Sequence, residues 1–333
     1  MATTIQRTIY TGTNVFVDPE GNLTGWNSGG AGGTSGIVWV NTAQNATFNL
    51  NIPRADINVF GVTGVIDRPQ LEAETATFEF GMIPNLATPA AVYNKTLIAD
   101  DLDALIADAI AETPVYVVAG APKVGAVKKA LMNSMTGEAT VGALANFTLS
   151  LTGATHTAAN PAYTGVDAQY DDDGTYTNVA VAATGLTAKA SVVTPQQVVL
   201  TQGGTGNDGS NGALVDEAYP DGNSDNLTAS CAQSASFSWD VPVETVLCLG
   251  SDPTSDGIAL GNPPGSSSFT VEALSAQLVT NGGKQDYKLT LGAYNFAMSG
   301  GNIDSRTHSL AVGDLYGSYN YVIGGTGDGF VVT

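Results

Sequence analysis

Charged residues are scarce in this chain of 333 residues, and positive ones are the scarcest. Only 13% of the residues are charged, with 11 Lys and Arg against 31 Asp and Glu. The net charge of −20 repels phosphate, so nucleic-acid binding through counterion release is disfavoured. The same repulsion lets DNA slide past a surface without sticking to it, and it also serves solubility.

Cysteine and histidine are equally few, with two of each. Cys231 and Cys248 fit no metal-binding or redox spacing. The apolar run VLCLG around Cys248 predicts buried free thiols in a reducing compartment rather than a disulfide. His156 and His308 stand in unrelated Thr- and Ser-rich settings that suit neither a metal site nor a catalytic base.

Motifs of catalysis and targeting are missing as well. The chain has no GxSxG, P-loop or HExxH motif. GGTGND (203–208) is a lone unit of a calcium repeat that needs several, and DDDG (171–174) fails the spacing of a calcium loop. No basic stretch precedes an apolar run at the start, and no window approaches about 18 apolar residues. We therefore expect no enzyme activity, cofactor, metal, signal peptide or membrane span.

What the chain does contain favours β-structure. Hydrophobic residues make up 43%, enough for a packed core, and 40 glycines accompany abundant Thr, Asn, Ala and Val. This mixture is typical of many short strands joined by uncharged turns. The predicted fold class is mainly β.

An internal repeat organises the sequence. ATFNLNIPRADINVFG (46–61) aligns without a gap to ASFSWDVPVETVLCLG (235–250). The matched pairs include Phe48 with Phe237, Pro53 with Pro242, Ile57 with Val246 and Gly61 with Gly250. Four shorter blocks keep the same order: 5–12 with 195–203, 76–80 with 267–271, 124–131 with 291–298, and 141–144 with 312–315. Collinear blocks predict two copies of one unit.

Strand periodicity runs through the repeated blocks. Phe48, Leu50 and Ile52 alternate with polar residues, and the second copy repeats the alternation. Such strands have one apolar and one wet face, as in a sandwich or barrel. We expect two tandem β-sandwich or barrel domains, at 1–153 and 191–333, joined by a connecting segment at 154–190.

One helix is expected to flank each copy, most clearly the first. In DDLDALIADAIAE, apolar residues recur at helical spacing, which predicts a helix at about 100–112. The matching stretch of the second copy, 271–283, has room only for a shorter helix. The apolar stripe of the first helix is Leu102, Leu105, Ile106, Ala109 and Ile110.

A duplicated, acidic β-protein with one helix per copy and long Gly/Asn-rich loops resembles the major tail protein of siphophages, in its form with two fused tube domains. The resemblance implies a structural virion protein, assembled in the host cytoplasm, that forms homotrimeric, pseudo-hexameric rings. The rings stack into a tail tube whose electronegative lumen passes DNA without specific binding. Tail-tip and tail-terminator proteins are the further partners that the resemblance implies. A capsid decoration, fibre or surface adhesin protein is the alternative.

Two sets of residues follow as candidate sites. Small polar side chains with sparse carboxylates suit a wall that DNA passes, so we expect the wet faces to line the lumen. The predicted lumen-facing residues are Thr47, Asn49, Asn51, Glu79, Ser236, Ser238, Asp240, Thr270 and Glu272. Loops longer than about 12–15 residues are usually functional or disordered, so the loops 12–36 and 203–227 are predicted to contact the adjacent ring. These loops contain Gly12, Trp26, Gly36, Gly203, Asp208 and Leu227.

Overall fold

The fold is mainly β, as the composition predicts. The computed structural model describes residues 14–18, 38–40, 42–58, 60–61, 63–85, 97–112, 115–120, 125–156, 169–170, 176–177, 193–203, 232–251, 258–261, 265–274, 285–310 and 317–333. Everything that follows concerns these residues.

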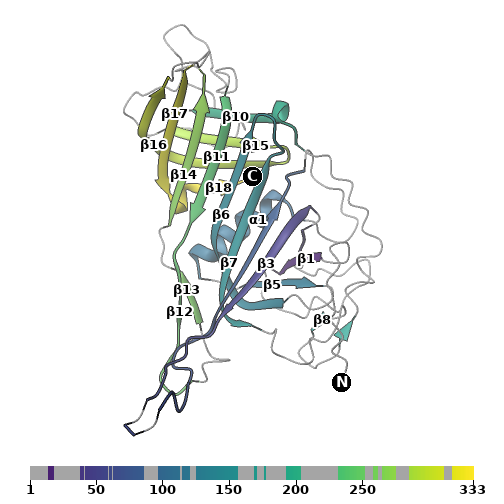
Figure 1. Ribbon diagram of the computed structural model, residues 1–333. Coiled ribbons are helices and arrows are strands. Elements are labelled where there is room, and N and C mark those ends of the chain that lie inside the picture. The colour runs from purple at the N-terminus through teal and green to yellow at the C-terminus, as the bar shows by residue number, and fades with distance from the viewer. Residues whose placement is uncertain are drawn as a thin grey trace.

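Eight strands form one long antiparallel layer, which we call the front sheet (Figure 1). In the order in which they pair, they are β3 (Ala43–Asn51), β4 (Thr75–Met82), β7 (Asn146–His156), β6 (Gly125–Thr140), β11 (Ala232–Asp240), β14 (Ser266–Ala273), β17 (Ser318–Thr326) and β16 (Tyr294–Ser309). The pairing of β6 with β11 joins the two halves of the chain into this single layer.

Shorter strands lie behind the front sheet and cross it steeply (Figure 1). They are β1 (Asn14–Asp18), β2 (Val38–Trp39), β5 (Val115–Gly120), β10 (Val198–Gly203), β15 (Gln285–Leu291) and β18 (Phe330–Val332). The two longest strands, β6 and β16, belong to both layers, because their first residues pair with β5 and with β15 respectively. Each long strand also has a register shift in its pairing with the next front-sheet strand, at residues 132–134 of β6 and 303–305 of β16.

The remaining described elements are short. β12 (Val243–Val246) pairs with β13 (Ile258–Gly261), and β8 (Gln169–Tyr170) pairs with β9 (Tyr176–Thr177). Two 3-10 turns, at Pro195–Gln197 and Gly327–Gly329, precede β10 and β18.

Both halves of the chain use one pairing order. The first half pairs its strands as β1–β5–β6–β7–β4–β3, and the second as β10–β15–β16–β17–β14–β11. Phe48 lies on β3 and Phe237 lies on β11, so this aligned pair occupies matching strands. A common topology agrees with the expected repeat, while duplication and the division into two domains stay predictions.

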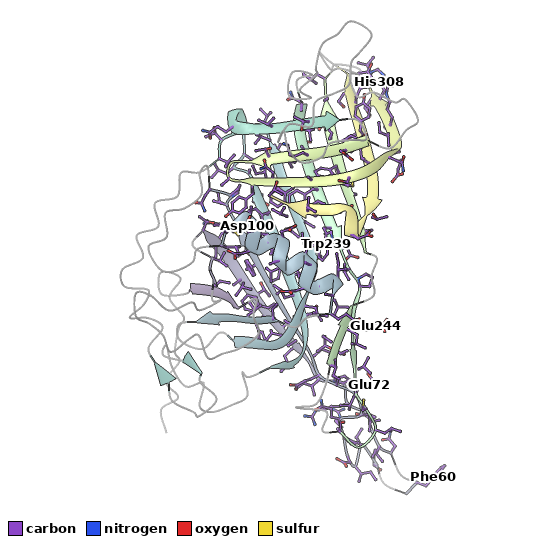
Figure 2. The ribbon with its side chains drawn as sticks, turned by 180° about the vertical axis from the view of Figure 1, so that it is seen from behind. Phe60, Glu72, Asp100, Trp239, Glu244 and His308 are labelled. Atoms are coloured by element: carbon purple, nitrogen blue, oxygen red, sulfur yellow. The ribbon has the colours of Figure 1, made fainter. Side chains whose placement is uncertain are left out.

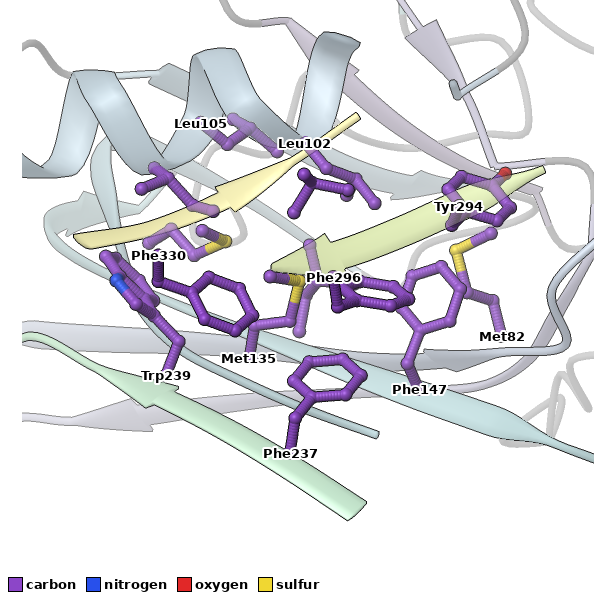
Figure 3. Close-up of a cluster of buried hydrophobic side chains, with 14 of the residues drawn as sticks. Met82, Leu102, Leu105, Met135, Phe147, Phe237, Trp239, Tyr294, Phe296 and Phe330 are labelled. Carbon is purple, nitrogen blue, oxygen red and sulfur yellow. The ribbon is translucent and has the colours of Figure 1, made fainter. Parts of the chain in front are cut away.

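The hydrophobic core is continuous through both halves (Figure 3). The ring of Phe147 on β7 meets those of Tyr294 and Phe296 on β16 edge-on, at centroid distances of 5.3 and 5.4 Å. Phe296 also stacks on Phe237 of β11 at 4.1 Å. The buried indole of Trp239 donates a 2.9 Å hydrogen bond to the carbonyl of Gly327. The inner faces of the strands thus pack into one aromatic cluster.

Helix α1 (Ala99–Ile110) forms where the apolar stripe predicts it. At its N-terminus the carboxylate of Asp101, the third helical residue, accepts a 3.1 Å hydrogen bond from the backbone N–H of the N-cap residue Ile98. Four of the five stripe residues are fully buried, and Ile110 is partly buried against the core. For the second copy, the expectation of a helix over 271–283 is wrong at its start, because Val271–Ala273 complete β14, and 275–283 lie outside the described residues.

Candidate functional site

The outer face of the front sheet carries a mostly polar surface, which we call the polar face; Val322, opposite Thr270, is an exposed apolar residue on it. Its strands are in register, so polar positions of consecutive strands lie directly opposite one another. One row crosses all eight strands: Asn45, Gly81, Thr148, Thr136, Ser238, Ser268, Gly324 and Asn302. The neighbouring row crosses seven: Thr47, Glu79, Ser150, Ser134, Asp240, Ser266 and Thr326.

All nine residues predicted to face a lumen lie on this polar face. Thr47 and Glu79 are directly opposite, and so are Ser236 and Thr270 across β11 and β14. Glu272 begins a further row with Ser234, Asn320 and Thr307. The face is therefore one surface assembled from both halves. Whether it lines a lumen stays a prediction.

The charges on the polar face are all negative in the described rows. The acids are Glu79, Asp240, Glu138 and Glu272, while Lys, Arg and His do not occur in these rows. Most other positions carry hydroxyls or amides, and the Oγ atoms of Ser238 and Ser268 lie 2.8 Å apart. In the described rows the surface is therefore polar and weakly acidic, with no cation to hold a phosphate.

Two open edges bound the front sheet. Within the described part of the chain, β3 pairs with β4 alone, and residues 302–309 of β16 pair with β17 alone. The two edges lie at opposite ends of the strand order, with six strands between them. Unpaired sheet edges are templates for pairing with another chain.

The connections β3–β4 and β11–β14 project together beyond the end of the front sheet as one hairpin arm, comprising residues 52–74 and 241–265 as far as they are described (Figure 2). The backbones of Ile57 and Asp67 bridge the first hairpin, and β12–β13 forms the second. The hydroxyls of Thr75 and Thr245 meet at 3.1 Å where the two hairpins leave the sheet.

Apolar side chains are unusually exposed on the hairpin arm. Phe60 at its tip and Leu249 at the matching turn are fully exposed, and each precedes a glycine with positive φ, Gly61 at 87° and Gly250 at 91°. The further exposed large apolar residues of the arm are Ile52, Ile57, Val65, Ile66, Leu71, Val246, Ile258 and Leu260. Exposed apolar side chains gathered on one projecting element make the arm a candidate interaction site.

Sequence reading missed this arm, although its signal was present. The aligned blocks end in VFG and CLG, each with a large apolar residue in a turn. The prediction of a buried Cys248 is wrong for the same reason, because its side chain is exposed in the second hairpin.

The loops predicted to stack rings are only partly described. Residues 14–18 of the first loop form β1, so this part is a strand and not a loop. Gly203 is the last residue of β10. Gly12, Trp26, Gly36, Asp208 and Leu227 lie outside the described residues, and their predicted role stays a prediction.

Groups that could support catalysis or metal binding are not gathered in the described residues. No set of three His, Cys, Asp or Glu side chains in this part of the chain could hold a metal ion. His308 is exposed and stacks on Tyr319 at a centroid distance of 4.3 Å. Within the same residues, no helix has the length and apolarity needed to cross a membrane.

Comparison with known proteins returned no relationship: neither the family models nor the curated proteins that were searched match this chain.

Proposed function

We propose that this chain is the subunit of a phage-type tail tube, a structural virion protein whose homotrimeric rings stack around a channel for DNA. The observation that carries the proposal is the polar face, which runs without a cation in its described rows across both halves and ends at two open sheet edges.

The chemistry of the face suits a channel wall. DNA bears about one negative charge per 1.7 Å of its axis, so a lysine or arginine on the wall would bind phosphate in a salt-dependent contact. Short hydroxyl and amide side chains keep the wall hydrated, and Glu79, Glu138, Asp240 and Glu272 add repulsion. DNA would pass such a wall without specific binding.

The width of the sheet favours three chains in a ring. At a spacing of about 4.8 Å, eight strands from each of three chains give a circumference of about 115 Å and a diameter of roughly 37 Å. Strand tilt widens such a barrel, and side chains narrow its channel by about 10 Å in all. The remaining opening admits a DNA duplex.

The hairpin arm supports the stacking of rings. It leads away from one end of the front sheet, whereas the β6–β7 turn at the other end of β6 exposes Val141 and Leu144. A contact between opposite ends of two copies is head-to-tail and can repeat without limit, as a tube requires. At the two ends of the tube, tail-tip and tail-terminator proteins would be the partners, and the assembled protein would reside in the virion tail.

Electron microscopy of the purified protein tests the proposal. At increasing concentration, negative-stain images should show hollow tubes of uniform diameter with stacked rings. Fibres without a channel, or isolated trimers that never lengthen, would instead support the alternative of a fibre, capsid decoration or adhesin protein. A protein that stays monomeric at every concentration would overturn both.

A further inference from the structure

The junction between the two halves is a direct pairing of strand edges. Residues Ser134–Thr140 of β6 lie antiparallel to Ser234–Asp240 of β11, with Gly137 opposite Phe237 and Thr136 opposite Ser238. This pairing places polar side chains on the polar face and apolar ones in the core. It shows how an edge of the β6 type fits an edge of the β11 type.

The two outer edges of the front sheet consist of the matching strands. By pairing order, β16 corresponds to β6 and β3 corresponds to β11. The long strands β6 and β16 also share a register shift at one place, between Met132 and Ser134 and between Ile303 and Ser305. The front sheet therefore has an edge of the β6 type, β16, on one side and an edge of the β11 type, β3, on the other.

The cross-strand partners show which residue of β16 corresponds to which residue of β6. Phe80, Leu149 and Met135 lie opposite one another in turn in the first half. At the matching places of the second half stand Val271, Tyr321 and Arg306. Two positions further along, Gly137 and His308 correspond, since they lie opposite Phe147 and Tyr319 respectively.

Matching residues are buried at the junction and exposed at the outer edges. Trp239 on β11 is fully buried, whereas Leu50, its counterpart on β3, is partly exposed. Ala139 on β6 is 7% exposed, whereas Leu310, at the corresponding place just beyond β16, is 72% exposed. The outer edges thus show the apolar surface that pairing covers at the junction.

We infer that β16 of one copy pairs with β3 of a second copy, in the register of the β6–β11 junction. Because Phe237 lies opposite Gly137, Phe48 of the second copy lies opposite His308. It follows that Asn49 lies opposite Thr307, and Thr47 opposite Ser309. The inference deepens the proposed function, because it names the contact that closes the ring.

The side chains at this contact are compatible on both faces of the sheet. On the polar face, Asn49 with Thr307 and Thr47 with Ser309 continue the rows of small polar groups. On the core face, Leu50 lies opposite Arg306, whose guanidinium is already over the rings of Tyr319 and Tyr321 at 5.2 and 5.7 Å. Its charge therefore keeps an aromatic partner when the edge is covered.

One residue difference between β6 and β16 changes the packing at the contact. At the junction, the ring of Phe237 lies where a side chain on Gly137 would be, because a Cβ there would come within 2.4 Å of the ring. At the outer edge, His308 takes the place of Gly137. The imidazole already stacks on Tyr319, so Phe48 meets the flank of an aromatic stack rather than a glycine.

A second copy is the occupant that fits these edges. Within one chain β3 and β16 do not pair, because they are the two ends of an open sheet with six strands between them. Another copy presents the complementary edge in the required direction, and repetition of one head-to-tail contact closes a ring when the rotation allows.

Disulfide trapping tests the register. In a Cys231→Ser, Cys248→Ser background, Asn49→Cys with Thr307→Cys should form a disulfide between chains on mild oxidation. The covalent species should end at the size of the closed ring. Thr136→Cys with Ser238→Cys is the matched positive control, which should cross-link within one chain. Asn51→Cys with Ser309→Cys is the negative control, because the inferred register separates these residues by four positions, about 13 Å.

Each outcome is decisive. Interchain cross-linking of the Asn49–Thr307 pair with none in the negative control supports the register, provided that circular dichroism matches the parent. Failure of this pair, equal cross-linking of the negative control, or failure of the Thr136–Ser238 pair would overturn it. Cross-linked rings that never stack would leave the inferred strand pairing intact and refute the tube. Tubes without this cross-link would support the tube and refute the inferred strand pairing.

Discussion

The ring of Phe237 lies directly against Gly137, across the strand pair that unites the two halves of the chain. A Cβ atom at Gly137 would lie 2.4 Å from Cε1 of that ring and 3.0 Å from Cβ of Phe147. Phe237 in turn stacks on Phe296, so the glycine fixes where the central aromatic cluster meets the front sheet. The union of the halves depends on this absence of a side chain.

Gly137→Ala should therefore destabilise the monomer. Overpacking a filled core costs about 1–3 kcal/mol, and the free energy of unfolding in urea should fall by that amount. Adding Phe237→Leu should recover part of the loss, because leucine lacks the ring atoms nearest the new methyl. Strictly additive effects of the two substitutions would contradict the contact.

Tyr294 should make the protein sensitive to alkali. Burial raises the pKa of Tyr294 to about 12, and its hydroxyl donates a 2.9 Å hydrogen bond to the carbonyl of Leu97. Since the folded pKa lies above the unfolded value of about 10, the stabilisation is complete below pH 10 and is lost as the pH rises toward 12. A shift of this size corresponds to about 3 kcal/mol at most.

Tyr294→Phe tests this effect. The variant should be less stable at neutral pH by about 1 kcal/mol, because the hydrogen bond is lost. It should also lose less stability between pH 10 and 12 than the parent in urea unfolding. Tyr319→Phe is the control, because its ring is only partly buried and it should keep the alkaline loss. Identical alkaline profiles for parent and Tyr294→Phe would contradict the assignment.

Charge reversal on the polar face should slow DNA and spare assembly. Glu79→Lys, Asp240→Lys and Glu272→Lys leave the apolar faces of their strands untouched, so tubes should still form. A ring of three chains would then carry about nine cations toward the phosphates, each a salt-dependent contact. DNA ejection should slow or stall at low salt and recover at high salt.

The matched control reverses three acids elsewhere: Asp100, Glu112 and Asp328, which are all exposed. It produces the same change in net charge away from the polar face, so ejection should proceed at the parent rate. Equal slowing by both variants would mean that net charge matters and the position of the face does not. Normal ejection by the polar-face variant would show that this face does not line the channel.

The tips of the hairpin arm should control elongation. Phe60→Ser with Leu249→Ser removes the two fully exposed apolar side chains without touching the front sheet. We expect rings of normal size that do not lengthen, measured by microscopy and sedimentation. Val331→Ser, which is also an exposed site but lies on β18, should leave elongation unchanged. Full-length tubes from the tip variant would contradict a role of the arm in stacking and would favour the loops 12–36 and 203–227 as the stacking contacts.

Local patterns in the sequence determined much of this protein. Alternation at Phe48, Leu50 and their neighbours predicted which side chains share a face, because successive residues of a strand point to opposite sides. Spacing at Leu102, Leu105 and Ile106 predicted the helix for a similar reason. The nine candidate wall residues share one face of the front sheet, and their position in a lumen stays a prediction. The repeated blocks placed Phe48 and Phe237 on matching strands.

Only the tertiary structure decided how these faces combine. Periodicity shows which way a side chain points on its own strand, but it does not name the strand that lies alongside, and pairing partners here are up to about a hundred residues apart. The β6–β11 junction merged two wet faces into one and left β3 and β16 as the outer edges. In the same way, the apolar run around Cys248 predicted a buried thiol, and the projection of both hairpins beyond the sheet left Cys248, Phe60 and Leu249 exposed (Figure 2).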